Sequence, residues 1–167
     1  NQVVNKCFSG AAVCMAPFYK VSEFHHYVVD EKFDPFSPRS KKWINVGSLF
    51  YLLLTCWFIF KWLRLLSINK SAIFWSLVGV TLGSNLFLYS ILSPSMTHVY
   101  SFFAVSSFLF STTVFFRKSK TNYFILASFL LGLIVIIRPI NAILILLLPF
   151  LSGGLDSLNS EFKRLTL

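Results

Sequence analysis

The distribution of charged residues constrains this sequence more than any other feature. Residues 43–152 contain no aspartate or glutamate, and their basic side chains are those of Lys61, Arg64, Lys70, Arg117, Lys118, Lys120 and Arg138. In the whole chain, 56% of the residues are hydrophobic and 13% are charged. A soluble core of 167 residues cannot bury so much apolar surface, so lipid must cover much of it.

The apolar stretches between these charges have the lengths of membrane helices. A helix needs roughly 20 apolar residues to cross a hydrocarbon core of about 30 Å. Four stretches reach or approach this length, and a fifth is shorter; they are residues 43–60, 72–92, 99–116, 123–137 and 140–151. We therefore predict an all-α fold, in which residues 43–152 form a polytopic transmembrane bundle of about five helices.

The flanking segments are expected to lie outside this bundle. Residues 7–19 form another apolar run, but it is short and contains a glycine and a proline, which favours an interfacial or re-entrant helix. We assign residues 1–42 to an external loop segment that carries this juxtamembrane helix, and residues 153–167 to a cytoplasmic tail. Because the chain begins at Asn1 without a methionine, we expect a fragment of a longer protein.

The positive charge follows the loops. A net charge of +9 would favour a nucleic-acid partner in a soluble protein, but here the basic residues sit in short connections, as the positive-inside rule expects. Three basic clusters fall on one side if the helices alternate in direction: Lys61/Arg64/Lys70, Arg117/Lys118/Lys120 and Lys163/Arg164. We predict that this side is cytoplasmic in a multi-pass inner-membrane protein, with no nucleic-acid partner.

No pattern in the sequence indicates a metal or a cofactor. The cysteines Cys7, Cys14 and Cys56 lack the spacing of metal ligands or of a disulfide framework. The external segment also contains a group of titratable residues, namely His25, His26, Asp30, Glu31 and Asp34. Their spacing matches no ligand set, and we interpret them as part of a solvated loop.

Polar residues at the predicted external ends of the helices are the candidates for chemistry. His98 lies in the first turn of a predicted helix, where it could bind a phosphate or exchange a proton, or merely pack against its neighbours. Arg138 ends a long apolar run and could hold a phosphate with its planar fork, or extend to lipid headgroups. Asn141 could cap the next helix or contact a ligand. Residues 83–85, Gly-Ser-Asn, are interpreted as a site of close helix packing.

Residues 5–19, 34–38, 94–102 and 132–141 follow one another in an order that resembles a known family. The most specific parts are Ser-Met-Thr-His-Val-Tyr-Ser-Phe, which ends at Phe102, and Arg-Pro-Ile-Asn, which begins at Arg138. In these motifs the chain resembles bacterial GT-C-type membrane glycosyltransferases related to protein mannosyltransferases, particularly the versions common in Bacteroidetes.

The resemblance implies a reaction and its partners. Such enzymes move a sugar from a polyprenyl-phosphate carrier to a lipid, glycan or protein acceptor at the external face of the membrane, without a further cofactor. It also implies that Lys6 and Arg138 contact the carrier phosphate, and that His98 and Tyr100 line the cavity near the sugar. Asn141 is added to these as a donor-binding candidate.

One departure from the family pattern concerns catalysis. The resemblance implies that the key acidic residue precedes the stretch similar to residues 6–19, so this chain would lack it. A second departure is that related enzymes often carry an acid where residues 95–98 stand here. We therefore expect activity of the parent protein and leave the catalytic residues of this chain unassigned.

Two other function classes stay open on the sequence alone. A transporter-like segment would place polar residues along a path through the bundle, although the middle of the predicted spans is nearly free of charge. A non-catalytic membrane subunit would use its glycines and serines only to pack against a partner.

Overall fold

The computed structural model describes residues 9–166, which are 84% helical and contain no strand. This confirms the predicted all-α class. In chain order the helices are α1 (Gly10–Val28), α2 (Pro38–Leu65), α3 (Lys70–Gly83), α4 (Leu86–Leu92), α5 (Thr97–Lys118), α6 (Thr121–Ile137), the 3-10 helix η1 (Pro139–Leu147), α7 (Leu148–Ser152) and α8 (Leu155–Thr166).

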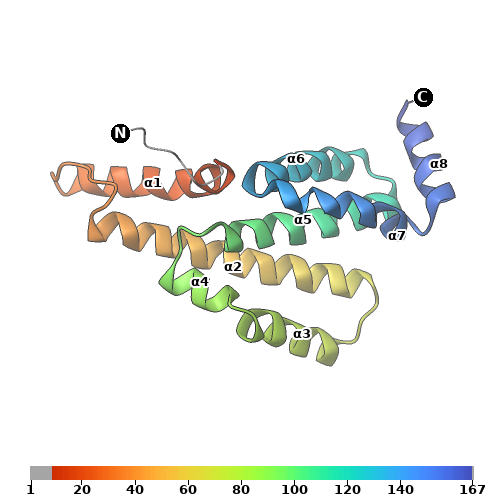
Figure 1. The fold of residues 1–167 in the computed structure, drawn as a ribbon, viewed down its shortest axis with the longest axis horizontal. Helices are drawn as coiled ribbons and strands as arrows, with labels where there is room; N and C mark the ends of the chain where they lie inside the picture. The colour runs from red at the N-terminus through yellow and green to blue at the C-terminus, as the bar shows by residue number, and fades with distance from the viewer. Residues whose placement is uncertain (1–8, 167) are drawn as a thin grey trace.

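Helix α5 lies at the centre of the bundle, with α2 on one side and α6 on the other (Figure 1). The central core is formed by Tyr100, Ala104 and Phe108 of α5 together with Leu130 and Ile134 of α6. Over their most apolar 18 residues, α5 is 67% buried and α2 is 28% buried. The arrangement therefore leaves much of α2 to face its surroundings.

Small hydroxyl residues allow the helices to approach α5 closely. Ser106, Ser107 and Thr113 of α5 are buried, and each hydroxyl donates to a carbonyl one turn earlier in the helix. Trp62 of α2 donates its indole N–H to the Thr113 hydroxyl at 2.9 Å. These three residues satisfy their own hydroxyls inside an apolar interface, as is typical of membrane helix packing, whereas the buried hydroxyls of Ser111 and Thr112 have no partner among the described residues.

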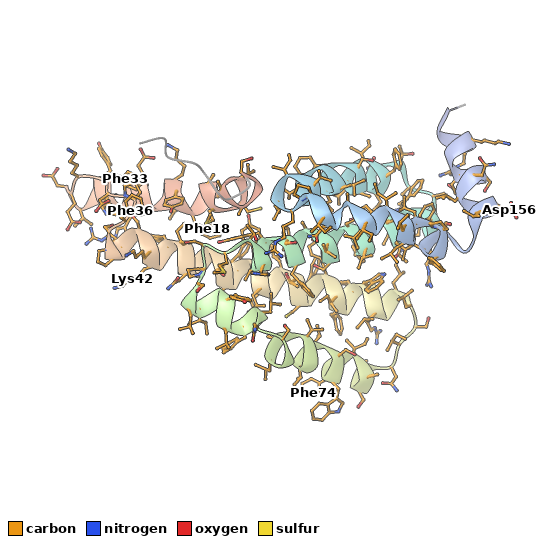
Figure 2. All side chains as sticks on the ribbon, viewed as in Figure 1. Phe18, Phe33, Phe36, Lys42, Phe74 and Asp156 are labelled. Carbon is orange, nitrogen blue, oxygen red and sulfur yellow. The ribbon has the colours of Figure 1, made fainter. Side chains whose placement is uncertain are left out.

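The outer surface of the bundle is apolar. Leu53, Phe74, Phe129 and Phe150 are among many large hydrophobic residues that are exposed, and Figure 2 shows Phe74 projecting away from α3. By length and composition, α2 and α5 can each cross a membrane. Contiguous apolar surface of this extent requires lipid rather than water, so the chain is a membrane protein.

The other predicted spans differ in detail from the expectation. Residues 72–92 are not one helix, because the chain breaks between α3 and α4 with a bend of 51°. Residues 123–137 lie within α6, which begins at Thr121 and at 17 residues is somewhat short for a span. Residues 140–151 are wound as a 3-10 helix up to Leu147, after which the short α7 begins.

The N-terminal helix is longer than predicted. Helix α1 continues past residue 19 to Val28 and lies antiparallel to the N-terminal half of α2 (Figure 1). His25 and His26 lie in α1 and His26 is 2% exposed, so the interpretation as a solvated loop is wrong for the two histidines. Asp30, Glu31 and Asp34 lie in the exposed connection between α1 and α2, as predicted. The hairpin explains the burial of His26, because Ser22 and His26 face the start of α2, whereas Lys20 and Glu23 stay exposed.

Hydrogen bonds close this hairpin. The Ser37 hydroxyl caps α2 by accepting from the Ser40 N–H at 3.1 Å, and it lies 3.2 Å from His26 Nε2. His26 Nδ1 lies 2.8 Å from the Ser22 carbonyl oxygen, and the Ser22 and Ser40 hydroxyls are 3.0 Å apart. The buried polar groups of Ser22, His26 and Ser40 are thus satisfied within the hairpin.

The two ends of the bundle differ in charge. Helices α2 and α5 end, and α3 and α6 begin, at the end that carries Arg64, Lys70, Lys118 and Lys120, which we call the basic end. There Arg117 donates to the Leu65 carbonyl oxygen and connects α5 to α2. The first turn of α5 and the last turn of α6 lie at the opposite end.

Candidate functional site

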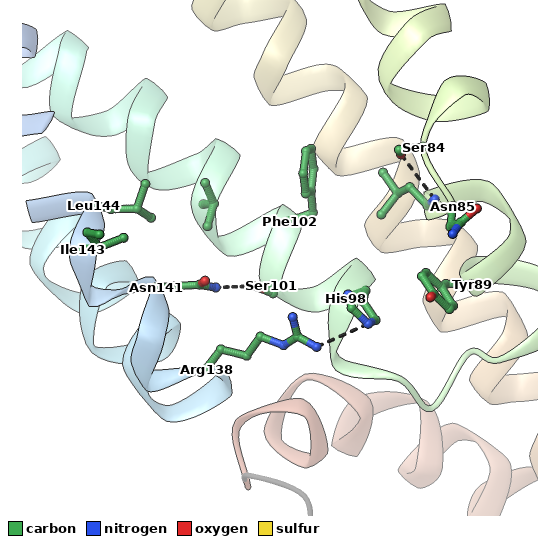
Figure 3. A pocket seen from close by; sticks show the side chains of 12 residues that line it. Ser84, Asn85, Tyr89, His98, Ser101, Phe102, Arg138, Asn141, Ile143 and Leu144 are labelled. Carbon is green, nitrogen blue, oxygen red and sulfur yellow. Dashed lines mark hydrogen bonds between the residues drawn. The ribbon is translucent and has the colours of Figure 1, made fainter.

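A cavity of about 450 Å³ opens at the end of the bundle opposite the basic end. Figure 3 shows α5 beneath it, the α3–α4 break on one side and η1 on the other. The residues that line it are Ser84, Asn85, Leu86, Tyr89, His98, Ser101, Phe102, Val105, Arg138, Asn141, Ile143 and Leu144.

Arg138 enters this cavity from the turn after α6. The residue is extended (φ −153°, ψ 104°), as expected of a residue that precedes a proline, and this ends the helix. Its side chain crosses to the first turn of α5, where Nε donates to the Thr97 hydroxyl at 2.9 Å and Nη2 lies 3.2 Å from His98 Nε2. Two helix ends are therefore joined through one guanidinium.

The contact with Arg138 defines the state of His98. A guanidinium can only donate hydrogen bonds, so His98 Nε2 accepts and the imidazole is neutral, with its proton on Nδ1. The ring also stacks on Tyr89 of α4, with centroids 4.5 Å apart and planes 8° from parallel. His98 is thus held by groups on two sides.

Asn141 stands on the next turn of the chain after Arg138. Its amide N–H donates to the Ser101 hydroxyl at 2.6 Å, which ties η1 to α5. Ser101 is one helical turn after His98, so the two lie on the same face of α5. The amide oxygen of Asn141 is an additional acceptor at the cavity wall.

The charge of Arg138 is not neutralised by the described residues. None of the ion pairs formed within residues 9–166 includes it, and its hydrogen-bond partners Thr97 and His98 are neutral. All six acidic residues of the chain lie in the α1–α2 hairpin or in α8. Arg138 is partly buried beside the apolar wall of the cavity, and a cation there without a counter-ion attracts an anion.

The cavity changes from polar to apolar along its length. Arg138, His98 and Asn141 form the polar part, whereas Phe102, Val105, Ile143 and Leu144 provide an apolar wall. An amphiphile with an anionic head and a hydrocarbon tail matches both parts. The lining includes no carboxylate, so the described residues of this cavity offer no strong base for deprotonating a hydroxyl.

Three of the predicted site residues, His98, Arg138 and Asn141, are brought together here. Tyr100 lies elsewhere: it is completely buried in the core, and its hydroxyl donates to the Pro94 carbonyl oxygen at 2.7 Å. Tyr100 is two positions after His98, which on a helix turns it about 200° away. Lys6 lies outside the described residues.

Among the lining residues that sequence reasoning missed, three lie at or near the α3–α4 break: Ser84, Asn85 and Tyr89. Ser84 and Asn85 border the cavity at the α3–α4 break, so the interpretation of residues 83–85 as close packing is wrong; a Cβ added to Gly83 would meet nothing within 4 Å. The run Gly-Ser-Asn is also a turn signal, which would have been the better interpretation. Tyr89 carries no signal in the sequence beyond its place one turn from that break.

Comparisons of the chain with protein-family models, curated proteins and solved structures find no match. The fold and the site therefore define the class by structure alone. The chain is an all-helical membrane protein with a cavity at one end of its bundle that is part polar and part apolar and is lined by an arginine.

Proposed function

We propose that this chain is the donor-binding part of an integral-membrane glycosyltransferase that uses a polyprenyl-phosphate-linked sugar. The resemblance in residues 94–102 and 138–141 to GT-C-type enzymes supplies the reaction class. The single observation that carries the proposal is the unneutralised guanidinium of Arg138 at the polar part of an amphiphilic cavity.

In this proposal the carrier phosphate replaces His98 as a partner of Arg138. A phosphate accepts two parallel hydrogen bonds from a guanidinium, and a charge-assisted bond is roughly twice as strong as a neutral one. The first isoprenoid units then follow Phe102, Val105 and Leu144. The amide of Asn141 and the Ser101 hydroxyl are available to the sugar hydroxyls.

Transfer also needs a base that takes the proton from the acceptor. We assign this role to a carboxylate of the parent protein outside this chain, as the resemblance implies. The acceptor is a lipid, a glycan or a protein at the external face, and the basic end faces the cytoplasm of a bacterial inner membrane. In this orientation, α1 is expected to stand near the external membrane surface.

The test is sugar transfer by the full-length parent protein in membranes supplied with polyprenyl-phosphate sugars. We expect Arg138→Gln to lower the rate at least tenfold. Arg64→Gln is the matched control, because Arg64 is an exposed arginine at the basic end. Equal rates for wild type and Arg138→Gln would overturn the proposed donor site.

One observation favours a second candidate, a transporter. A membrane helix that is broken beside a cavity, as α3 and α4 are, is typical of substrate paths through transporters. A transporter would move the amphiphile across a vesicle membrane without transferring its sugar. Uptake without transfer, abolished by Arg138→Gln, would therefore favour this candidate.

A further inference from the structure

The C-terminal helix α8 leaves the bundle at a fixed angle. Gly153 (φ 88°) and Gly154 (φ 136°) both have positive φ, a conformation that glycine adopts without strain. They produce a bend of 98° between the helical segment that ends at Ser152 and α8. In Figure 1, α8 accordingly lies across the end of the bundle where α5 ends and α6 begins.

A second contact holds α8 in this direction. Ser119, a left-handed residue (φ 51°) between α5 and α6, donates its hydroxyl to Glu161 Oε1 at 3.1 Å. Arg164 Nη2 donates to the Ser119 carbonyl oxygen at 3.1 Å and pairs with Glu161 at 2.9 Å. The polar flank of α8 is therefore attached to the α5–α6 turn.

The sequence of α8 is amphipathic. Its apolar residues recur with helical period, at Leu155, Leu158, Phe162 and Leu165. The polar residues Asp156, Asn159, Ser160, Lys163 and Arg164 fall between them. Leu155 is 71% exposed, so the bundle does not cover the start of the apolar face.

The surroundings of α8 are cationic. Arg117, Lys118 and Lys120 lie in or beside the turn to which α8 is attached, and Lys163 is exposed on α8 itself. Glu161, the acidic residue at this contact, is paired with Arg164. Within α8 itself Asp156 and Glu161 balance Lys163 and Arg164, so the excess positive charge comes from the α5–α6 turn beside it. A short helix with one apolar face, perpendicular to the neighbouring spans and beside a cationic turn, has the features of a helix in the headgroup layer.

We propose that α8 lies in the plane of the membrane surface at the basic end, with its apolar face in the acyl boundary and Lys163 and Lys118 against the phosphates of anionic phospholipids. The occupant of the apolar face is the bilayer itself. Charge complementarity favours this over a protein partner, because the basic end of a membrane bundle already faces anionic headgroups. The inference is independent of the sugar-transfer proposal.

The test measures membrane depth in the full-length protein reconstituted into vesicles. A genetically encoded fluorescent amino acid replaces Leu158 on the apolar face or, as the matched control, Ser160 on the polar face. We expect brominated lipids to quench the label at position 158 several-fold more than the label at position 160, and aqueous iodide to show the opposite order. Equal quenching at both positions, or iodide access to position 158, would overturn the proposal.

A second measurement tests the lipid charge. In vesicles that contain phosphatidylglycerol, we expect the label at position 158 to lie deeper than in pure phosphatidylcholine. The double variant Lys118→Gln/Lys163→Gln should lose this difference while it keeps the quenching by brominated lipids. A difference that persists in the double variant would contradict the phosphate contacts, and capture of α8 by a soluble partner in place of lipid would contradict the membrane position.

Discussion

Arg138 Nη2 lies 3.2 Å from His98 Nε2, so the residue that directly follows α6 is held by the first turn of α5. The two residues are 40 positions apart in the chain, and both line the same cavity. Because His98 is neutral, the pair leaves a full positive charge at the cavity wall. This relationship underlies the proposed affinity for a lipid-linked phosphate.

The shape of the guanidinium should matter as much as its charge. Arg138→Lys keeps the positive charge but loses the planar guanidinium. That group can donate to the Thr97 hydroxyl and to a phosphate at the same time. We expect phosphate affinity to fall by about tenfold, since a hydrogen bond to a charged group is worth about 1.5–3 kcal/mol. Isothermal titration calorimetry with a short-chain prenyl phosphate measures this affinity. An affinity equal to that of wild type would show that only the charge of Arg138 matters, and not its shape.

A carboxylate added to the cavity should neutralise Arg138. Asn141→Asp is nearly isosteric and places a negative charge on the same wall. We expect prenyl-phosphate binding to weaken by about tenfold or more, because like charges repel in a poorly solvated site. Asn159→Asp, on the polar face of α8, is the control with the same change. Tighter binding in Asn141→Asp would contradict the electrostatic account.

Close contact between α1 and α6 should depend on Gly10. A Cβ at this position would lie 2.5 Å from the Ile137 backbone nitrogen, which cannot move aside easily. We expect Gly10→Ala to lower stability by about 1–3 kcal/mol, the usual effect of overpacking.

The matched control is Gly79→Ala, since a Cβ at Gly79 would meet nothing within 4 Å. In the interior of α3 that substitution should be neutral or stabilise by about 0.5–1 kcal/mol. Thermal unfolding in detergent compares the two variants. Equal unfolding temperatures would show that α1 does not pack against α6 as described.

The α1–α2 hairpin should depend on the cap at Ser37. Ser37→Ala removes the acceptor of the Ser40 N–H and the partner of His26. We expect a loss of about 1 kcal/mol, typical of a removed N-cap, and faster proteolysis at the α1–α2 connection. Ser71→Ala, an exposed position in α3, is the control. An unchanged cleavage rate in Ser37→Ala would mean that the hairpin does not rely on this cap.

Much of this fold follows from hydrophobic length alone. The long helices α2 and α5 were predicted because apolar runs of their length have few alternatives in lipid. The full length of α1 was not, because Lys20, Glu23 and His25 give it the composition of a loop. The burial of one face of α1 depends on its packing against α2. Such a tertiary contact cannot be predicted from the local sequence pattern.

The candidate site was predictable in part for a simple geometric reason. His98 and Arg138 begin and end neighbouring antiparallel helices, so they meet at one end of the bundle. Tyr100 could have been placed correctly as well, since two positions along a helix reverse the direction of a side chain. Asn85 and Tyr89 could not, because their place at the cavity depends on the angle of the α3–α4 break.

Native mass spectrometry of the full-length protein, with equal concentrations of a polyprenyl phosphate and the matching phosphate-free polyprenol, tests the central claim most directly. The account predicts that wild type retains the phosphate in large excess over the polyprenol, and that Arg138→Gln binds the two equally while Arg64→Gln behaves as wild type. Equal retention of the two lipids by wild type, or an unchanged preference in Arg138→Gln, would contradict the claim that Arg138 holds a lipid-linked phosphate.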